Sequence, residues 1–169
     1  MRNVILVGMP CAGKTTVGKA LAEKIRYDFL DTDQIIEISE QQDINTLIKN
    51  KGEAYFRNVE FELTNNLLKE NLCNTVISVG GGLPVNFDNM KKLKEIGITI
   101  SLDVTLAMLR KRYLENLNEE IKKGNNVENF DYLYEQRKAI YQEAEININV
   151  TEMTVSEAVN QIIEQIRVN

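Results

Sequence analysis

Residues 8–15 hold the side chains and glycines whose types and spacing can most directly do chemistry. They fit the pattern GxxxxGK(S/T), whose fixed positions are Gly8, Gly13, Lys14 and Thr15. The glycines let backbone N–H groups turn toward phosphate oxygens, Lys14 supplies a point charge, and the Thr15 hydroxyl can bind Mg²⁺. The pattern predicts a loop that binds the phosphates of a nucleoside triphosphate. The expected nucleotide contacts are Cys11, Ala12, Gly13, Lys14, Thr15 and Thr16.

The residues on either side of this loop give it the context that a phosphate site requires. Residues 4–7 are an uninterrupted apolar run, as in a buried parallel strand. Residues 15–26 have the periodicity of a helix, so the loop joins a strand to the positive end of a helix. We therefore expect a phosphate-binding loop (P-loop) rather than an accidental Gly-rich turn. Cys11 stands at a variable position and is expected to be a spacer.

Strands and helices are expected to alternate along the rest of the chain. Five short strands separated by helices favour a three-layer α/β/α fold with a five-stranded parallel sheet, in which the P-loop follows strand 1. Ligands of such sheets bind beyond the carboxyl ends of the strands. The predicted strands are residues 4–7, 28–31, 75–79, 98–103 and 146–150. The predicted helices are 15–26, helical segments within 34–51, 53–70, 87–96, one that begins near 105, 131–143 and 155–168.

Polar residues or glycines follow three of these strands. The first ends in the P-loop, the second in Asp31-Thr32-Asp33, and the third in residues 80–82, which are all glycine. Three consecutive glycines lose much backbone entropy on folding, so they indicate that another group approaches the backbone closely. These three strand ends are expected to converge on one cleft. A simpler alternative for the two aspartates, a strand-ending turn and a helix cap, stays open.

Composition indicates a small enzyme with one core. The chain has 169 residues, 43% of them hydrophobic, and residues 1–169 are expected to form one domain. A net charge of −5 argues against nucleic-acid or anionic-membrane partners. No stretch is apolar and long enough to span a bilayer, and no signal-type segment is evident, so a cytoplasmic monomer is the default. The chain has no histidine, so proton transfer must use Asp, Glu, Lys or water.

The order of the motifs resembles the shikimate kinases, a family of nucleoside-monophosphate-kinase-like P-loop proteins. The resemblance rests on GKTTVGK at the P-loop, on the Asp31-Thr32-Asp33 triplet, on Phe56-Arg57 with Glu60, on the triple glycine and on Arg137 near the end. The spacing agrees through nearly the whole chain. The resemblance implies ATP-dependent phosphorylation of shikimate at its 3-hydroxyl, with Mg²⁺ as the cofactor.

The resemblance also implies roles for individual residues. Asp33 is expected to accept hydrogen bonds from the ring hydroxyls of shikimate and to orient the attacking one or take its proton, so Asp33 and Lys14 are the expected catalytic residues. Asp31 is expected to assist Thr15 at Mg²⁺, directly or through water. The remaining substrate contacts are the backbone of Gly81 and two guanidinium groups, Arg57 and Arg137, which can bind a carboxylate through paired hydrogen bonds.

Each arginine also has a simpler interpretation. Arg57 could be half of a surface pair with Glu60, three residues later on the same predicted helix, although Glu60 could also brace the guanidinium or touch substrate. Arg137 lies in a segment rich in charge and could be a solvated side chain. Without the family pattern, the sequence leaves both alternatives open.

The chain departs from the family between residues 111 and 129, where a helical lid is expected. Shikimate kinases usually carry an Arg-Pro pair there, whose arginine reaches the ATP phosphates, and this chain has none. Such a cation would stabilise charge on the transferred phosphoryl group. The candidates to replace it are Arg110, Arg112, Lys122 and Lys123.

The missing Arg-Pro pair leaves alternative functions open. The chain could be a shikimate kinase with a rebuilt lid, or a kinase for another small hydroxy acid such as gluconate. A third alternative is a nucleotide-binding protein that kept the fold and lost catalysis. The joint presence of Asp33, Arg57, Gly81 and Arg137 favours the first.

Overall fold

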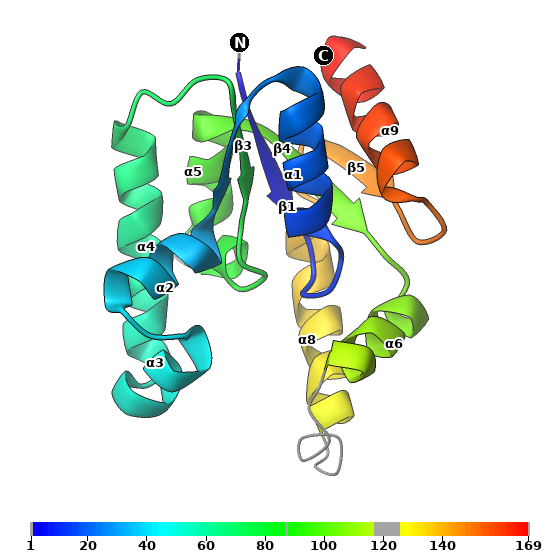
Figure 1. Ribbon diagram of the computed structural model, residues 1–169. Coiled ribbons are helices and arrows are strands. Elements are labelled where there is room, and N and C mark those ends of the chain that lie inside the picture. Colours follow the sequence, from blue (N-terminus) through cyan, green and yellow to red (C-terminus); the bar gives the residue numbers. More distant parts are fainter. Residues whose placement is uncertain (1, 87, 117–125, 169) are drawn as a thin grey trace.

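The computed structural model describes residues 2–86, 88–116 and 126–168, with the backbone alone for 126–128. Its centre is one sheet of five parallel strands in the order β2-β3-β1-β4-β5 (Figure 1). The three-layer fold with a parallel sheet is therefore confirmed. The strands are β1 (Asn3–Val7), β2 (Asp28–Asp31), β3 (Thr75–Ser78), β4 (Gly97–Asp103) and β5 (Ile146–Asn149).

Helices cover both faces of this sheet. The first and last helices pack against each other on one face, and α4, α5 and α8 lie on the other (Figure 1). The change of face between α1 and the helices α4, α5 and α8 follows from right-handed crossovers, because the chain reverses its direction across the sheet after β2. The α-helices are α1 (Lys14–Ile25), α2 (Thr32–Glu40), α3 (Ile44–Lys51), α4 (Glu53–Lys69), α5 (Asn89–Ile96), α6 (Leu106–Asn116), α8 (Asn126–Tyr141) and α9 (Val155–Val168).

The central strand explains why the P-loop is held rigidly. Every residue of β1 is buried, since it pairs with β3 on one side and β4 on the other and has helices on both faces. A strand enclosed in this way reads as a continuous apolar run, which is why residues 4–7 were recognisable in the sequence. The chain leaves this strand directly into the P-loop.

Most predicted elements are present, with shifted ends. Residues 34–51 form two helices, because Gln41 ends α2 in the left-handed conformation (φ 55°) and the Asp43 side chain caps α3. Before α5 there is a short 3₁₀ helix, η1 (Leu83–Val85), with Pro84 in its first turn. The predicted helix at 131–143 begins earlier, at Asn126. Of the lid range, residues 111–116 and 126–129 are helical, and 117–125 lie outside the described residues.

The two P-loop glycines have the backbone that the sequence predicted. Gly8 has φ 143° and Gly13 has φ 95°, a region that side-chain-bearing residues rarely adopt. A Cβ at Gly8 would also lie 2.9 Å from the carbonyl oxygen of Leu102.

No helix within residues 2–86, 88–116 and 126–168 is both long and apolar enough to cross a bilayer.

Asn3 secures the start of β1 at the edge opposite the P-loop. Its buried side chain donates to the carbonyl oxygens of Leu72 (2.8 Å) and Ile96 (3.0 Å) and accepts from the backbone amide of Thr75 (3.1 Å). These three bonds join the beginnings of β1, β3 and β4 through one amide group.

Replacing this amide should destabilise the protein. In Asn3→Ala, three backbone groups lose their partner, one in a buried bond and two in partly buried bonds, and we expect the free energy of unfolding to fall by about 2–4 kcal/mol in urea denaturation. Arg2→Ala is the matched control, because it removes only an exposed 3.5 Å ion pair with Glu145 and should cost less than about 1 kcal/mol. Equal losses would contradict this role of Asn3.

Candidate functional site

A cleft of about 610 Å³ lies at the carboxyl ends of the strands. The P-loop lines it together with Asp31 and Asp33 after β2, Ser78 and Gly81 at the end of β3, and Arg112 of α6. The beginning of α9 closes another side. The predicted convergence of three strand ends on one cleft is therefore confirmed.

Lys14 lies inside the P-loop. Its ammonium group donates to the carbonyl oxygens of Gly8 (3.0 Å) and Met9 (2.9 Å), and the residue is 8% exposed. Burial lowers the pKa of Lys14 to about 8, while the charges of Asp33 and Asp31 oppose this shift. The site thus contains a buried cation that lacks a full anionic partner, as a phosphate-binding position requires.

Thr15 and Asp31, the two predicted metal ligands, contact each other. The Thr15 hydroxyl donates to Asp31 Oδ2 at 2.7 Å and lies 3.4 Å from the Ser78 hydroxyl. The other oxygen of Asp31 caps α2 by accepting from the amides of Asp33 (3.1 Å) and Gln34 (3.4 Å). The helix-cap interpretation is therefore correct, but it uses only one of the two carboxylate oxygens.

These oxygens fit Mg²⁺, a hard cation that is held by few protein groups when it also binds phosphates and water. The described residues contain no group of three or more His, Cys, Asp or Glu side chains that could hold a metal alone. Thr15 and Asp31 remain predicted ligands, and Ser78 is an oxygen beside them that the sequence analysis did not single out.

Asp33 is a mostly buried carboxylate at the cleft. Its burial raises its pKa, the negative charge of Asp31 adds to this shift, and Lys14 opposes it. A carboxylate with a raised pKa is a stronger proton acceptor than an exposed one. Asp33 therefore has the environment expected of a general base, while its catalytic role stays a prediction.

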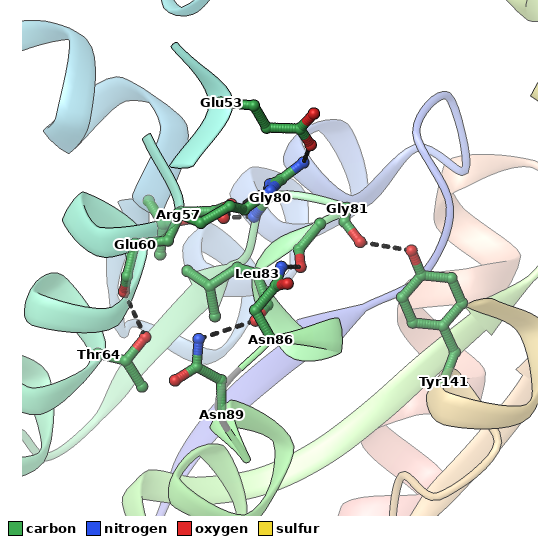
Figure 2. Close-up of polar contacts among 12 residues, drawn as sticks. Glu53, Arg57, Glu60, Thr64, Gly80, Gly81, Leu83, Asn86, Asn89 and Tyr141 are labelled. Atoms are coloured by element: carbon green, nitrogen blue, oxygen red, sulfur yellow. Dashed lines mark hydrogen bonds and ion pairs between the residues drawn. The ribbon is translucent and has the colours of Figure 1, made fainter. Parts of the chain in front are cut away.

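Arg57 is held between two carboxylates of its own helix (Figure 2). Its guanidinium donates to Glu60 at 2.7 Å and to Glu53 at 2.9 Å. The Glu60 side chain is 1% exposed and that of Glu53 is 67% exposed. Burial raises the pKa of Glu60, and Arg57 opposes the shift. The pair with Glu60 exists as the sequence allowed, but it is buried rather than a surface pair, so Glu60 braces the guanidinium.

Arg137 is partly buried, on the face of α8 that looks toward the site. Its charge acts on Lys14, on Glu60 and on the hydroxyl of Tyr141, which places it near both the P-loop and the Arg57 pair. This position does not support a merely solvated charge. The charge of Arg57 acts on Asp33 and that of Arg137 on Lys14, although neither arginine is among the residues that line the cleft.

The three glycines after β3 lie where other groups come close. A Cβ at Gly80 would collide with the Asp33 carboxylate, and one at Gly82 with the Arg57 guanidinium. A Cβ at Gly81 would lie 2.8 Å from the ring of Pro10 in the P-loop. The predicted close approach is confirmed for protein groups, while approach of the Gly81 backbone to a substrate stays a prediction.

The four lid-cation candidates differ in position. Arg110 pairs with Asp131 at the surface, away from the cleft. Arg112 lines the cleft, and its guanidinium donates to the carbonyl oxygen of Cys11 at 3.2 Å. Lys122 and Lys123 lie outside the described residues. Arg112 is therefore the described candidate that reaches the P-loop.

Sequence reasoning missed several polar groups at the site. The Thr32 hydroxyl oxygen accepts a hydrogen bond from the Gly80 amide at 2.9 Å, and Thr32 stands between the two predicted aspartates, which was a usable signal. Ser78 ends the strand before the glycines. Tyr141, which donates to the Gly81 carbonyl, carried only one signal, its i+4 spacing from Arg137.

Comparisons with known proteins agree on one family. A shikimate kinase family model matches residues 10–167. A shikimate kinase of Persephonella marina is 40% identical over 167 residues, which covers 99% of this chain and 100% of that relative. One of Clostridium botulinum is 42% identical over 146 residues, 85% of each chain.

Solved structures give the same result. Shikimate kinase from Acinetobacter baumannii, in complex with shikimate, has a TM-score of 0.90 at 30% identity and covers 100% of this chain and 94% of its own. The enzyme from Bacteroides thetaiotaomicron has a TM-score of 0.86 at 29% identity and covers 98% of both chains. A gluconokinase from Sinorhizobium meliloti has a TM-score of 0.59 at 15% identity, covering 94% of this chain and 87% of its own, a likeness of fold alone.

The two carboxylates on Arg57 should differ sharply in their contribution to stability. Glu60→Ala leaves a partly buried guanidinium without its buried partner, and we expect a loss of about 3–5 kcal/mol in urea denaturation. Glu53→Ala removes a mostly exposed partner of the same guanidinium and should cost less than about 1 kcal/mol. If the two variants lost the same free energy of unfolding, the burial of the Glu60 pair would not contribute to stability.

Proposed function

The chain belongs to the shikimate kinase family, and we propose that its cleft transfers the γ-phosphoryl group of ATP to the 3-hydroxyl of shikimate. One observation carries the proposal: the P-loop and the acceptor groups Asp33 and Gly81 line the same cleft. Donor and acceptor are thereby brought together, and positioning is the main requirement of phosphoryl transfer.

The donor half of the proposed site is the P-loop. Its backbone amides, among them those of Cys11, Ala12 and Gly13, surround the phosphates of ATP together with the amide of Thr16. Lys14 exchanges its two carbonyl partners for phosphate oxygens. Their negative charge stabilises the ammonium form of Lys14, which burial destabilises.

The acceptor half is formed by residues from α2, α4, α8 and the triple glycine. Arg57 and Arg137 hold the shikimate carboxylate, and the Gly81 backbone contacts the bound ring. Asp33 orients the 3-hydroxyl and takes its proton, while that oxygen forms a bond to the γ-phosphorus. The bond from phosphorus to the bridging oxygen breaks, and its electron pair leaves on ADP. The buried state of Asp33, with its raised pKa, supports this assignment.

Thr15 and Asp31 are the proposed ligands of Mg²⁺, directly or through water, and the Ser78 hydroxyl lies beside them. When bound, the ion neutralises charge on the β- and γ-phosphates. The protein's own part is to hold the Thr15 and Asp31 oxygens together at the P-loop.

Arg112 is the proposed nucleotide-binding cation at the base of the lid. Its guanidinium already reaches the P-loop through the Cys11 carbonyl, whereas Arg110 is engaged by Asp131.

We also propose that residues 1–169 act as one kinase domain, as a cytoplasmic monomer without a nucleic-acid partner. The net charge of −5 supports the last point.

A coupled ADP-release assay with ATP and Mg²⁺ tests the acceptor. We expect turnover that depends on shikimate and exceeds turnover with gluconate or quinate, because the chain belongs to the shikimate kinase family and shares only the fold with the gluconokinase. Lys14→Ala is the control and should lower kcat by about 100-fold or more, since the transferred charge loses its partner. Faster turnover of gluconate would refute the acceptor assignment alone, and no turnover of any acceptor by folded protein would refute the kinase.

The two arginines of α6 should differ in their effect on ATP. Arg112→Ala removes a cation that lines the cleft, and we expect KM for ATP to rise about 10-fold or more with little change in KM for shikimate. Arg110→Ala changes the same charge on the same helix but outside the cleft, and it should alter either KM by less than about 2-fold. An unchanged KM for ATP in Arg112→Ala would show that Arg112 is not the cation that binds the nucleotide.

A further inference from the structure

The backbone after β3 is held by side chains on several sides. Residues 80–83, here called the acceptor loop, carry the triple glycine and lead into η1. Figure 2 shows side chains that reach three of its carbonyl oxygens. Tyr141 donates to the Gly81 carbonyl (2.5 Å), Asn86 to the Gly82 carbonyl (2.9 Å) and Asn89 to the Leu83 carbonyl (2.9 Å). In a fourth bond, the Gly80 amide donates to the Thr32 hydroxyl (2.9 Å).

Tyr141 differs from the other anchors in where it comes from. Asn86 and Asn89 follow the loop directly in sequence, whereas Tyr141 lies 60 residues later, at the end of α8. The residue is buried, with 3% of its surface exposed. Its hydrogen bond is therefore a tertiary link between α8 and the acceptor loop.

The same hydroxyl also lies next to the charged groups of the acceptor site. Arg137 precedes Tyr141 by one helical turn, and its charge acts on the Tyr141 hydroxyl. The charges of Arg57 and Glu60 reach it as well. Tyr141 thus joins the loop backbone to the helix that carries Arg137.

Burial fixes the direction of the bond to Gly81. It raises the pKa of Tyr141 to about 12, although Arg137 opposes this shift, so the hydroxyl keeps its proton at physiological pH. A carbonyl oxygen can only accept, and Tyr141 is therefore the donor.

The opposite side of the loop is also blocked. A Cβ at Gly81 would lie 2.8 Å from the Pro10 ring, so the P-loop packs directly against this residue. Gly81 is held by Tyr141 through its carbonyl and confined by Pro10 at its Cα. Its peptide unit has little freedom to rotate.

We propose that Tyr141 is a positioning residue for the acceptor: through its bond to the Gly81 carbonyl it fixes the acceptor loop against α8, the helix that carries Arg137, so that the loop and Arg137 can contact shikimate at once. The proposal rests on the proposed function of the cleft. Tyr141 itself need not touch the substrate, because it acts through the Gly81 peptide.

Tyr141→Phe in the full chain tests this role, because it keeps the buried ring and removes only the hydroxyl. We expect KM for shikimate to rise about 5- to 20-fold, kcat to change less than about 3-fold, and KM for ATP to stay within about 2-fold. Tyr132→Phe makes the same change at a 65% exposed position of the same helix and should alter none of the three.

A merely structural role would give a different pattern. Equal increases in both KM values, or a lower melting temperature with unchanged kinetics, would overturn the proposal. Wild-type turnover measured in parallel tests the proposed function separately, and if another acceptor is preferred, the KM ratio is taken with that acceptor. If Tyr141→Phe does not fold, Asn86→Ala releases the Gly82 carbonyl of the same loop, and an unchanged KM for shikimate there would equally overturn the proposal.

Discussion

The close approach of three groups to the glycines after β3 is the constraint on which the rest of the site depends. Asp33, Pro10 and Arg57 each occupy the space where a side chain would begin at Gly80, Gly81 or Gly82. The P-loop, the Asp33 carboxylate and the Arg57 guanidinium therefore surround one short backbone segment. Any larger residue there would push one of these groups away, so the two halves of the cleft would separate.

Electrostatics in the cleft is organised by pairing rather than by net charge. The chain carries a net charge of −5, yet the cations Lys14 and Arg112 line the cleft. Burial destabilises the charged forms of Lys14 and Asp33, and each opposes the shift of the other. Arg57 differs from Lys14 and Asp33, because its ion pairs with Glu60 and Glu53 stabilise its charge and hold it in place. The groups assigned to chemistry are thus left with unmet charge, while the group assigned to binding is braced.

The hydrogen bonds of Asp31 show how one side chain serves fold and site together. One of its oxygens caps α2, and the other accepts from Thr15 in the P-loop. The cap fixes where α2 begins and so where Asp33 lies, two residues later in the first turn of the helix. The ends of β1 and β2 are linked by this carboxylate, although β3 lies between the two strands in the sheet.

The sequence by itself determined the P-loop, the strand pattern and the family, because these depend on residues close together in the chain and on a spacing that many relatives share. It also named Asp33, Arg57, Gly81 and Arg137, but it could not decide whether the arginines were solvated. Only the tertiary structure decided that Glu60 is buried, that Arg112 rather than Arg110 faces the P-loop, and that Tyr141 holds the Gly81 carbonyl. Burial and contacts between distant segments arise when helices pack on the sheet, and no local pattern in the sequence encodes them.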